Sequence, residues 1–236
     1  MVQFMTFREY QLFLTYLDAH DKRSKIKLTS VSGDPSEISF GNAVRGGNER
    51  KVNNFLNSLN KDSIEKHLLA QLSFDLTLDR DTSFDESSAH DEGDGGVPDI
   101  DKVNMTITLF QLGIIAKRPG IIKLFMQKVL EDTEGDERLG LLKNILGTKA
   151  FLTFTKNSKC YDKDDRALDG MNAFHLGAKY SPASLAQIFE HLNDSSLMEE
   201  NQINELLEAP ENQLNQTPLH IAAAHSAGGG YSIAAR

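Results

Sequence analysis

Among the 236 residues of this chain, two histidines at equivalent places in two short motifs are the leading candidates for chemistry. His175 lies in NAFHLGA and His220 lies in TPLHIAA, and an imidazole can bind a metal or act as a general base. Cys160, the single cysteine, could supply a thiolate nucleophile to such a base. The repeated motif sets the histidine position, however, and no catalytic signature surrounds Cys160. We therefore interpret the histidines as structural, and we expect no enzyme activity, no metal and no cofactor.

Two acidic stretches, DRDTSFDE and DKDDRALDG, have the composition of calcium loops but not their spacing. An EF-hand loop needs oxygen ligands at its first, third and fifth positions and glycine at its sixth. Counted from Asp162, the fifth residue is Arg166, and counted from Asp79, the sixth is Phe84. Both stretches are therefore expected to be solvated acidic loops.

The negative charge of the chain is concentrated in one segment. The net charge is −9, and residues 79–101 contain nine acidic residues against one arginine. A segment this polar cannot bury enough apolar surface to order itself, which predicts a flexible acidic insertion. The acidic balance also argues against nonspecific nucleic-acid binding, which needs clustered lysine and arginine.

The cysteine content and the hydropathy of the chain indicate the cellular compartment in which the protein is expected. A single cysteine allows no intramolecular disulfide and no cysteine-based zinc site, which favours a reducing environment. The N-terminus has no basic n-region, and Arg8, Glu9 and Gln11 interrupt its apolar residues, so it does not match a signal peptide. No stretch approaches the roughly 18 apolar residues of a membrane span. We expect a cytoplasmic protein, located in the host cytosol if it is a secreted effector.

Apolar residues recur at helical spacing along most of the chain. Between Phe4 and Leu17 they are spaced by three and four, which predicts a helix with one apolar face. Helical patterns then alternate with breaks at Gly46–Gly47 and Arg118–Gly120. One apolar, β-prone piece, AFLTFT, follows a helix candidate. The chain is thus expected to be built from short helix, break, helix segments.

The stretch NQTPLHIAAAHS, which begins at Asn215, resembles the ankyrin repeat signature, in which Thr-Pro-Leu-His opens a short helix. Thr217 is a natural N-cap, and Pro218 is preorganised for the first helical position. Asn215 takes the turn position where the repeat usually has glycine, because asparagine also accepts a left-handed backbone. The resemblance implies that His220 holds the spacing of neighbouring turns by hydrogen bonds.

Three other segments fit the same frame. DGMNAFHLGAKYSPASLAQIFEHL places Gly170 at the turn and His175 at the histidine position. ISFGNAVRGGNERKVNNFL places Phe40 at the leucine position and Gly47 at the break. FQLGIIAKRPGIIKLF keeps only the helix, break, helix shape. Such units cannot bury an apolar face alone, so stacking them would build one continuous core.

The resemblance implies an all-α fold, an ankyrin-repeat α-solenoid of helix-turn-helix units with an N-terminal capping helix and long inter-repeat insertions. Ankyrin units recur every ~33 residues, whereas Asn172 and Thr217 are 45 residues apart, so insertions must separate the units. The expected order is a cap helix and connector (1–30), unit 1 (31–78), the acidic insertion (79–101), a degenerate unit 2 (102–135), a helical insertion and connector (136–168), unit 3 (169–193), an inserted helix (194–212) and an incomplete unit 4 (213–236).

By resemblance, we expect a non-catalytic protein–protein interaction module, an adaptor or scaffold that binds a partner protein on its concave face. No nucleic acid, membrane or small-molecule substrate is expected as a partner. Turn tips and the exposed ends of the first helices would form the contact surface. These residues are Arg45, Asp169, Met171, Lys179, Tyr180, Gln216 and His225. Tyr180 is the expected anchor, because exposed aromatic side chains dominate interface energies.

An alternative function is the N-terminal targeting arm of a longer multidomain protein, such as an intracellular bacterial effector, whose activity lies beyond residue 236. Irregular, insertion-rich ankyrin arrays resemble such proteins. The tail SAGGGYSIAAR is also too short and glycine-rich to form a good second helix for the last unit. This favours a protein that continues past Arg236 and a poorly ordered tail from about Gly228.

Overall fold

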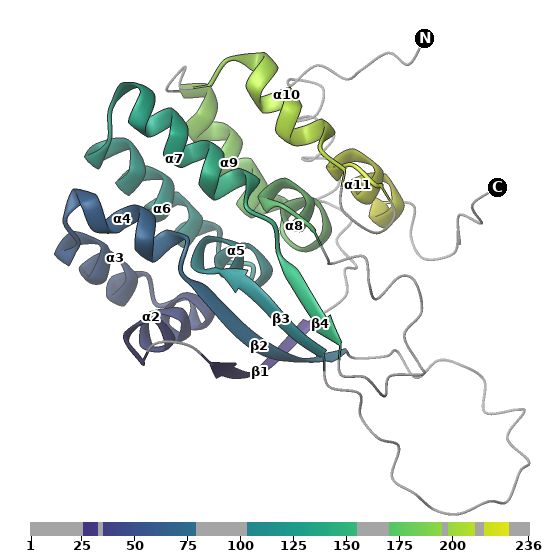
Figure 1. Cartoon of the computed structure of the whole chain (residues 1–236), viewed down its shortest axis with the longest axis horizontal. Helices are drawn as coiled ribbons and strands as arrows, with labels where there is room; N and C mark the ends of the chain where they lie inside the picture. The colour runs from purple at the N-terminus through teal and green to yellow at the C-terminus, as the bar shows by residue number, and fades with distance from the viewer. Residues whose placement is uncertain are drawn as a thin grey trace, which may run out of the picture.

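The computed structural model describes residues 26–32, 35–78, 103–154, 170–194, 198–210 and 215–226. Most of these residues are helical, and a small antiparallel sheet extends from the helices (Figure 1). The predicted cap helix before residue 26, the acidic insertion 79–101 and the tail after Ser226 lie outside the described residues. The mostly helical class predicted from the sequence is confirmed, and the strands are an addition to it.

In the described part of the chain, the helices follow one another in three groups of three, and a tenth helix begins after the third group. We call the members of each group the first, second and third helix, in chain order. The bounds are α2 (Pro35–Gly46), α3 (Glu49–Ser58) and α4 (Lys61–Leu68); α5 (Leu109–Ile115), α6 (Pro119–Asp132) and α7 (Gly135–Gly147); α8 (Ala173–Tyr180), α9 (Pro182–Asp194) and α10 (Glu200–Glu208); and α11 (Pro218–Ser226).

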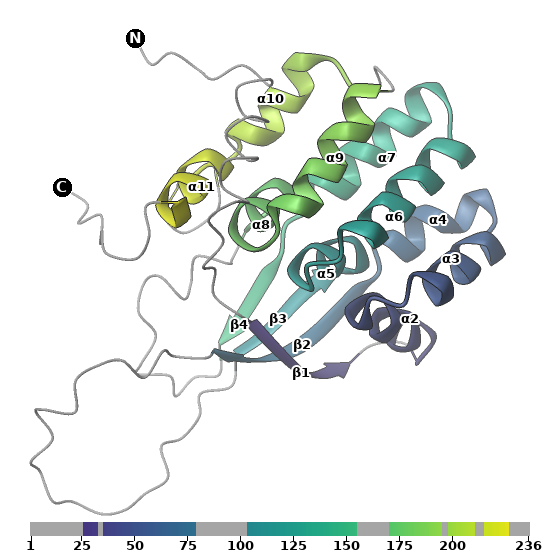
Figure 2. The ribbon, with the colours of Figure 1, turned by 180° about the vertical axis from the view of Figure 1, so that it is seen from behind.

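Equivalent helices of successive groups lie side by side (Figure 2). The first helices α2, α5, α8 and α11 pack in a row, and the second helices α3, α6 and α9 pack in another. The third helices are linked by polar and apolar contacts. Lys61 of α4 forms a 2.7 Å ion pair with Glu137 of α7, and a Leu206 methyl of α10 lies against Gly147 of α7. The helices α7 and α10, which fall in segments predicted as insertions, therefore occupy the same place in their groups as α4.

A four-stranded sheet connects the groups at one end. Strands β1 (Ile26–Ser32), β2 (Gln71–Leu78), β3 (Val103–Thr108) and β4 (Phe151–Phe154) pair antiparallel in that order. The β2–β3 hairpin lies between the first and second helical groups, and β4 leads from the second group toward the third. Register pairs Leu72 with Ile107 and Phe74 with Met105, and all four side chains are buried. This alternation is the period of two that a half-buried strand requires.

Aromatic side chains join the first two groups. Phe40 of α2 stacks on Phe55 of α3, with ring centroids 4.0 Å apart, and contacts Phe125 of α6 edge-on at 6.1 Å. Phe125 also lies 6.0 Å from Phe110 of α5. One continuous cluster of buried apolar side chains includes residues from all three groups and α11. The groups therefore share a core, since none of the short helices could bury its apolar face alone.

A close approach between α8 and α9 requires glycine at position 177. A Cβ built on Gly177 would lie 3.0 Å from the Cβ of Leu185, and the Leu185 methyls would be 3.3 Å away. By contrast, Gly140 on the exposed face of α7 has nothing within 4 Å of such a Cβ. Adding a methyl to a packed interface forces helices apart, whereas adding it to an exposed helix raises helix propensity.

We expect Gly177→Ala to lower the free energy of unfolding by about 1–3 kcal/mol. The matched control Gly140→Ala should raise it by up to about 1 kcal/mol. Urea unfolding followed by circular dichroism measures both. If the two variants shift the midpoint in the same direction, the close α8–α9 packing described above is wrong.

Candidate functional site

The first helices of the second and third groups begin with the same reciprocal hydrogen-bond pattern. In α5, Thr108 Oγ1 accepts the N–H of Gln111 at 3.2 Å, and Gln111 Oε1 accepts the N–H of Thr108 at 2.9 Å. In α8, Asn172 Oδ1 accepts the N–H of His175 at 3.1 Å, and Nδ1 of His175 accepts the N–H of Asn172 at 3.4 Å. Each arrangement is a capping box, which satisfies two backbone donors at a helix start.

The same box recurs at α11 with the predicted Thr-Pro-Leu-His residues. The N–H of Thr217 donates to His220 Nδ1 at 3.2 Å, and the N–H of His220 donates to Thr217 Oγ1 at 3.4 Å. The residues before these helices have the backbone that the sequence predicted. Gly170 has φ +80° and Asn215 has φ +52°, the left-handed region in which glycine and asparagine are favoured.

The third residue of two of these helices also binds the chain segment that leads to the next group. Gln111 Nε2 donates to the carbonyl of Thr148 at 2.7 Å, and Thr148 directly follows α7. His175 Nε2 lies 3.1 Å from the carbonyl of Gln216, just before α11. We call these two hydrogen bonds the group links. One side chain thus caps its own helix and fixes the start of the next group. The sequence predicted this role for His175. Gln111 has the same role, although it is not a histidine.

Burial lowers the pKa of His175 from 6.5 to about 4. The hydrogen bond to the Gln216 carbonyl opposes this effect because it favours a protonated ring, while the Lys149 ammonium adds to it by repulsion. The imidazole is fully buried, so it is neutral at pH 7. Because a carbonyl only accepts, Nε2 carries the proton that is donated to Gln216, while Nδ1 lies 3.4 Å from the capping N of Asn172 and 2.6 Å from Asn172 Oδ1. The assignment of His175 as a structural residue is therefore supported by its geometry.

The structure corrects two of the predicted partner-binding residues. Tyr180 is only 2% exposed and Met171 is completely buried, so neither can anchor a partner. The cause is the position of α8, which packs against α5, α7, α9, α10 and α11. These neighbours cover both the start and the end of the helix. The end of α8 is accessible mainly at Lys179, whose ammonium lies 5.7 Å from the centre of the Tyr180 ring.

The remaining predicted residues lie apart along the stack. Arg45 ends α2, Lys179 lies in the last turn of α8, and both are half-buried. Gln216 is half-buried, and its carbonyl accepts the group link from His175. Asp169 lies outside the described residues, and only the backbone of His225 is described, within α11. No single cluster of the predicted residues is formed.

Cations gather instead where each first helix turns into the second helix. We call this surface the basic edge. Its residues are Arg45, Arg50, Lys51, Lys117, Arg118, Lys123 and Lys179. Arg118 joins two successive turns, because its Nε donates to the carbonyl of Arg45 at 3.1 Å. Within the turns themselves, residues 45–51, 116–123 and 179–182, the sequence has only Glu49 as an acid.

The end of α6 that lies away from the basic edge, and the start of α10, are acidic. The turn from α6 to α7 and the start of α10 contain Glu131, Asp132, Glu134, Asp136, Glu137 and Glu199. Some of this charge is paired, since Asp132 forms a 2.7 Å ion pair with Lys128. Around α6, positive charge therefore lies at the basic edge and negative charge lies at the other end of the helix.

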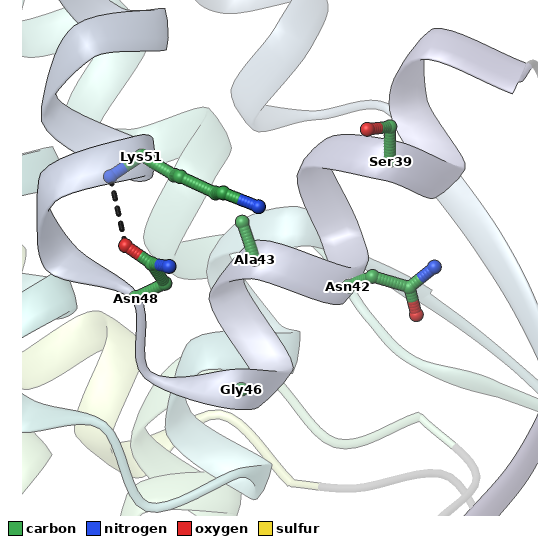
Figure 3. Close-up of a pocket in the computed structure, with 6 residues that line it drawn as sticks. All are labelled: Ser39, Asn42, Ala43, Gly46, Asn48 and Lys51. Carbon is green, nitrogen blue, oxygen red and sulfur yellow. Dashed lines mark hydrogen bonds between the residues drawn. The ribbon is translucent and has the colours of Figure 1, made fainter.

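An open polar pocket of about 350 Å³ lies on the basic edge, between α2 and the start of α3 (Figure 3). Its lining residues are Ser39, Asn42, Ala43, Gly46, Asn48 and Lys51. Asn48 caps α3 by accepting the N–H of Lys51 at 3.0 Å. The Lys51 side chain extends over Ala43 toward α2, and the Ser39 hydroxyl faces it (Figure 3). The sequence did not indicate this pocket, because its residues are small or polar and carry no motif.

The described part of the chain shows no arrangement for metal chemistry. Within it, no three histidine, cysteine, aspartate or glutamate side chains are grouped to hold a metal ion. Cys160 lies outside the described residues. Among the helices searched in the same described segments, none is long and apolar enough to cross a membrane. Comparisons with family models, curated proteins and solved structures find no match to this chain.

We expect acid to weaken the fold through His175. The unfolded chain takes up a proton below pH 6.5, whereas folded His175 resists it until about pH 4. This contribution to stability is present above pH 6.5 and is lost as the pH falls toward 4. By linkage, the loss is about 3 kcal/mol.

His175→Gln is the matched variant, because Gln111 already makes the equivalent link with an amide. Wild type and variant should be unfolded with urea at pH 7 and pH 4. Wild type should lose more stability than the variant, by about 3 kcal/mol. Equal losses would mean that His175 is not the buried neutral ring described here.

Tyr180→Ala should destabilise the fold by about 3 kcal/mol, because it empties a buried aromatic site. Tyr180→Phe retains the ring and should remain within about 1 kcal/mol of wild type. Thermal unfolding of both variants measures this difference. Wild-type stability for Tyr180→Ala would contradict the burial of this residue.

Proposed function

We propose that the chain is an irregular ankyrin-like solenoid that acts as a non-catalytic binding module for another protein. The single observation that carries this proposal is the recurrence of one helical group, with capping boxes at α5, α8 and α11 and group links at α5 and α8. The Thr-Pro-Leu-His residues of α11 and their counterparts in α8 resemble the ankyrin signature. Stacked repeats offer extended surfaces, which such proteins use for binding partners.

The third helices and the sheet distinguish this chain from a regular ankyrin array. Helices α4, α7 and α10 extend each helix pair, and strands β2 to β4 replace short turns between groups. The third helices recur at the same place in each group, so we interpret them as part of an enlarged unit. The 45 residues between Asn172 and Thr217 accommodate one such third helix.

The basic edge is the surface that we assign to the partner. Of its seven cations, five are exposed, Arg50, Lys51, Lys117, Arg118 and Lys123. Rows of like charge at an interface accelerate association with an oppositely charged surface and suppress binding of others. The partner that fits is therefore a protein with an acidic surface. This assignment replaces the predicted Tyr180 anchor with a charged surface on neighbouring turns.

Photo-crosslinking tests this assignment within single helices. A benzophenone amino acid would be placed at Lys123 or at Glu131, which are both exposed and lie near opposite ends of α6. A second pair, Arg50 and Ser58, samples the two ends of α3 in the same way. Irradiation in cells that express the chain, followed by mass spectrometry, identifies what is captured.

We expect one protein with an acidic surface to be captured at Lys123 and Arg50 but not at Glu131 or Ser58. Its capture should decrease as salt rises, because the Debye length shortens from about 10 Å at 0.1 M to about 3 Å at 1 M. Capture at Glu131 and Ser58 instead would place the partner at the other ends of α6 and α3 and contradict the proposal.

A further inference from the structure

The pocket between α2 and α3 contains polar groups that make no hydrogen bond or ion pair with described residues. Lys51 is exposed, and its ammonium has no acidic partner in the described part of the chain. The Ser39 hydroxyl and the Asn48 side-chain NH₂ likewise have no described partner. These groups come from two helices and line one pocket (Figure 3). The pocket therefore offers an ammonium with neutral donors around it and no carboxylate in its lining.

Small residues create the space for a ligand group. Ala43 is the α2 residue beside the end of the Lys51 side chain, and Gly46 lies further along, at the end of α2 (Figure 3). A Cβ added to Gly46 would meet nothing within 4 Å, so this side of the pocket is open. A ligand group can therefore approach between the two helices and reach Lys51 and Ser39 together. An ammonium and a hydroxyl at one position form charge-assisted hydrogen bonds with an anionic oxygen.

We propose that this pocket binds the carboxylate of a glutamate or aspartate side chain on the partner protein. The inference rests on the proposed function, since it specifies one contact within the basic edge. Lys51 would donate to one carboxylate oxygen, and Ser39 would donate to the same carboxylate from α2. Asn48 would supply a neutral donor from its side-chain NH₂.

The donor set fits a carboxylate better than a phosphate. Backbone N–H groups at a helix start are the usual phosphate cradle, but the N–H of Lys51 already donates to Asn48 Oδ1. No arginine lines the pocket, so the bidentate guanidinium contacts that favour phosphate are missing from its lining. One ammonium with neutral donors matches the single charge of a carboxylate.

The test uses the full chain, labelled with ¹⁵N, and an acetylated, amidated tripeptide with glutamate between two alanines. The matched peptide has glutamine at its centre, and inorganic phosphate is a third ligand. Backbone amide shifts of Ser39, Asn42 and Asn48 report on the pocket. We expect the glutamate peptide to shift these amides and to bind more tightly than the glutamine peptide or phosphate.

Lys51→Gln should weaken binding of the glutamate peptide about tenfold, which corresponds to the loss of one charge-assisted hydrogen bond. Lys143→Gln, an exposed lysine on α7, is the control and should leave binding unchanged. Equal binding of the two peptides, tighter binding of phosphate, or an unchanged affinity in Lys51→Gln would each overturn the proposal. Crosslinking at Lys123 is measured separately, so a partner captured there while the peptide fails would reject the pocket and retain the proposed function.

Discussion

The arrangement of the helical stack depends on one kind of hydrogen bond, made by the third residue of a first helix. Gln111 and His175 each accept their own capping N–H and extend a second polar atom to a carbonyl in the following connection. For Gln111 that carbonyl belongs to Thr148, directly after α7, and for His175 it belongs to Gln216, just before α11. A short helix is therefore started, and its distance to the next group is set, by the same side chain. Apolar packing of the rows stabilises the stack, but it does not by itself fix where each group begins.

Some of this architecture could be predicted from the sequence because it depends on local chemistry. Thr217, Pro218 and His220 indicate a helix start, and Asn215 and Gly170 indicate left-handed turns, which the backbone angles confirm. Gln111 was missed because an amide there does not resemble the histidine signature, although it makes the same link. The capping Thr108 was missed because it also ends a strand.

Features that depend on distant neighbours could not be predicted in this way. Tyr180 is the last residue of a short helix and could have been exposed, but α8 has neighbouring helices on several sides. In the sheet, Leu72 and Phe74 pair with Ile107 and Met105, which follow only after a long connection. The sequence alone does not indicate this register. The pocket depends on Lys51 reaching across to α2, which only the α2–α3 packing determines. Residues at such positions can be assigned only once the rows of helices are known.

The side chains that make the two group links differ in their response to protons, because an imidazole titrates and an amide does not. The Gln111 amide cannot titrate, so the junction between the second and third groups keeps its link at any moderate pH. The His175 ring takes up a proton only near pH 4, and the protonated ring still donates from Nε2 to the Gln216 carbonyl. The cost of acid is therefore the burial of a charged ring in the third group, and not the loss of its link. Which group responds to acid is set by whether an amide or an imidazole occupies the same helical position.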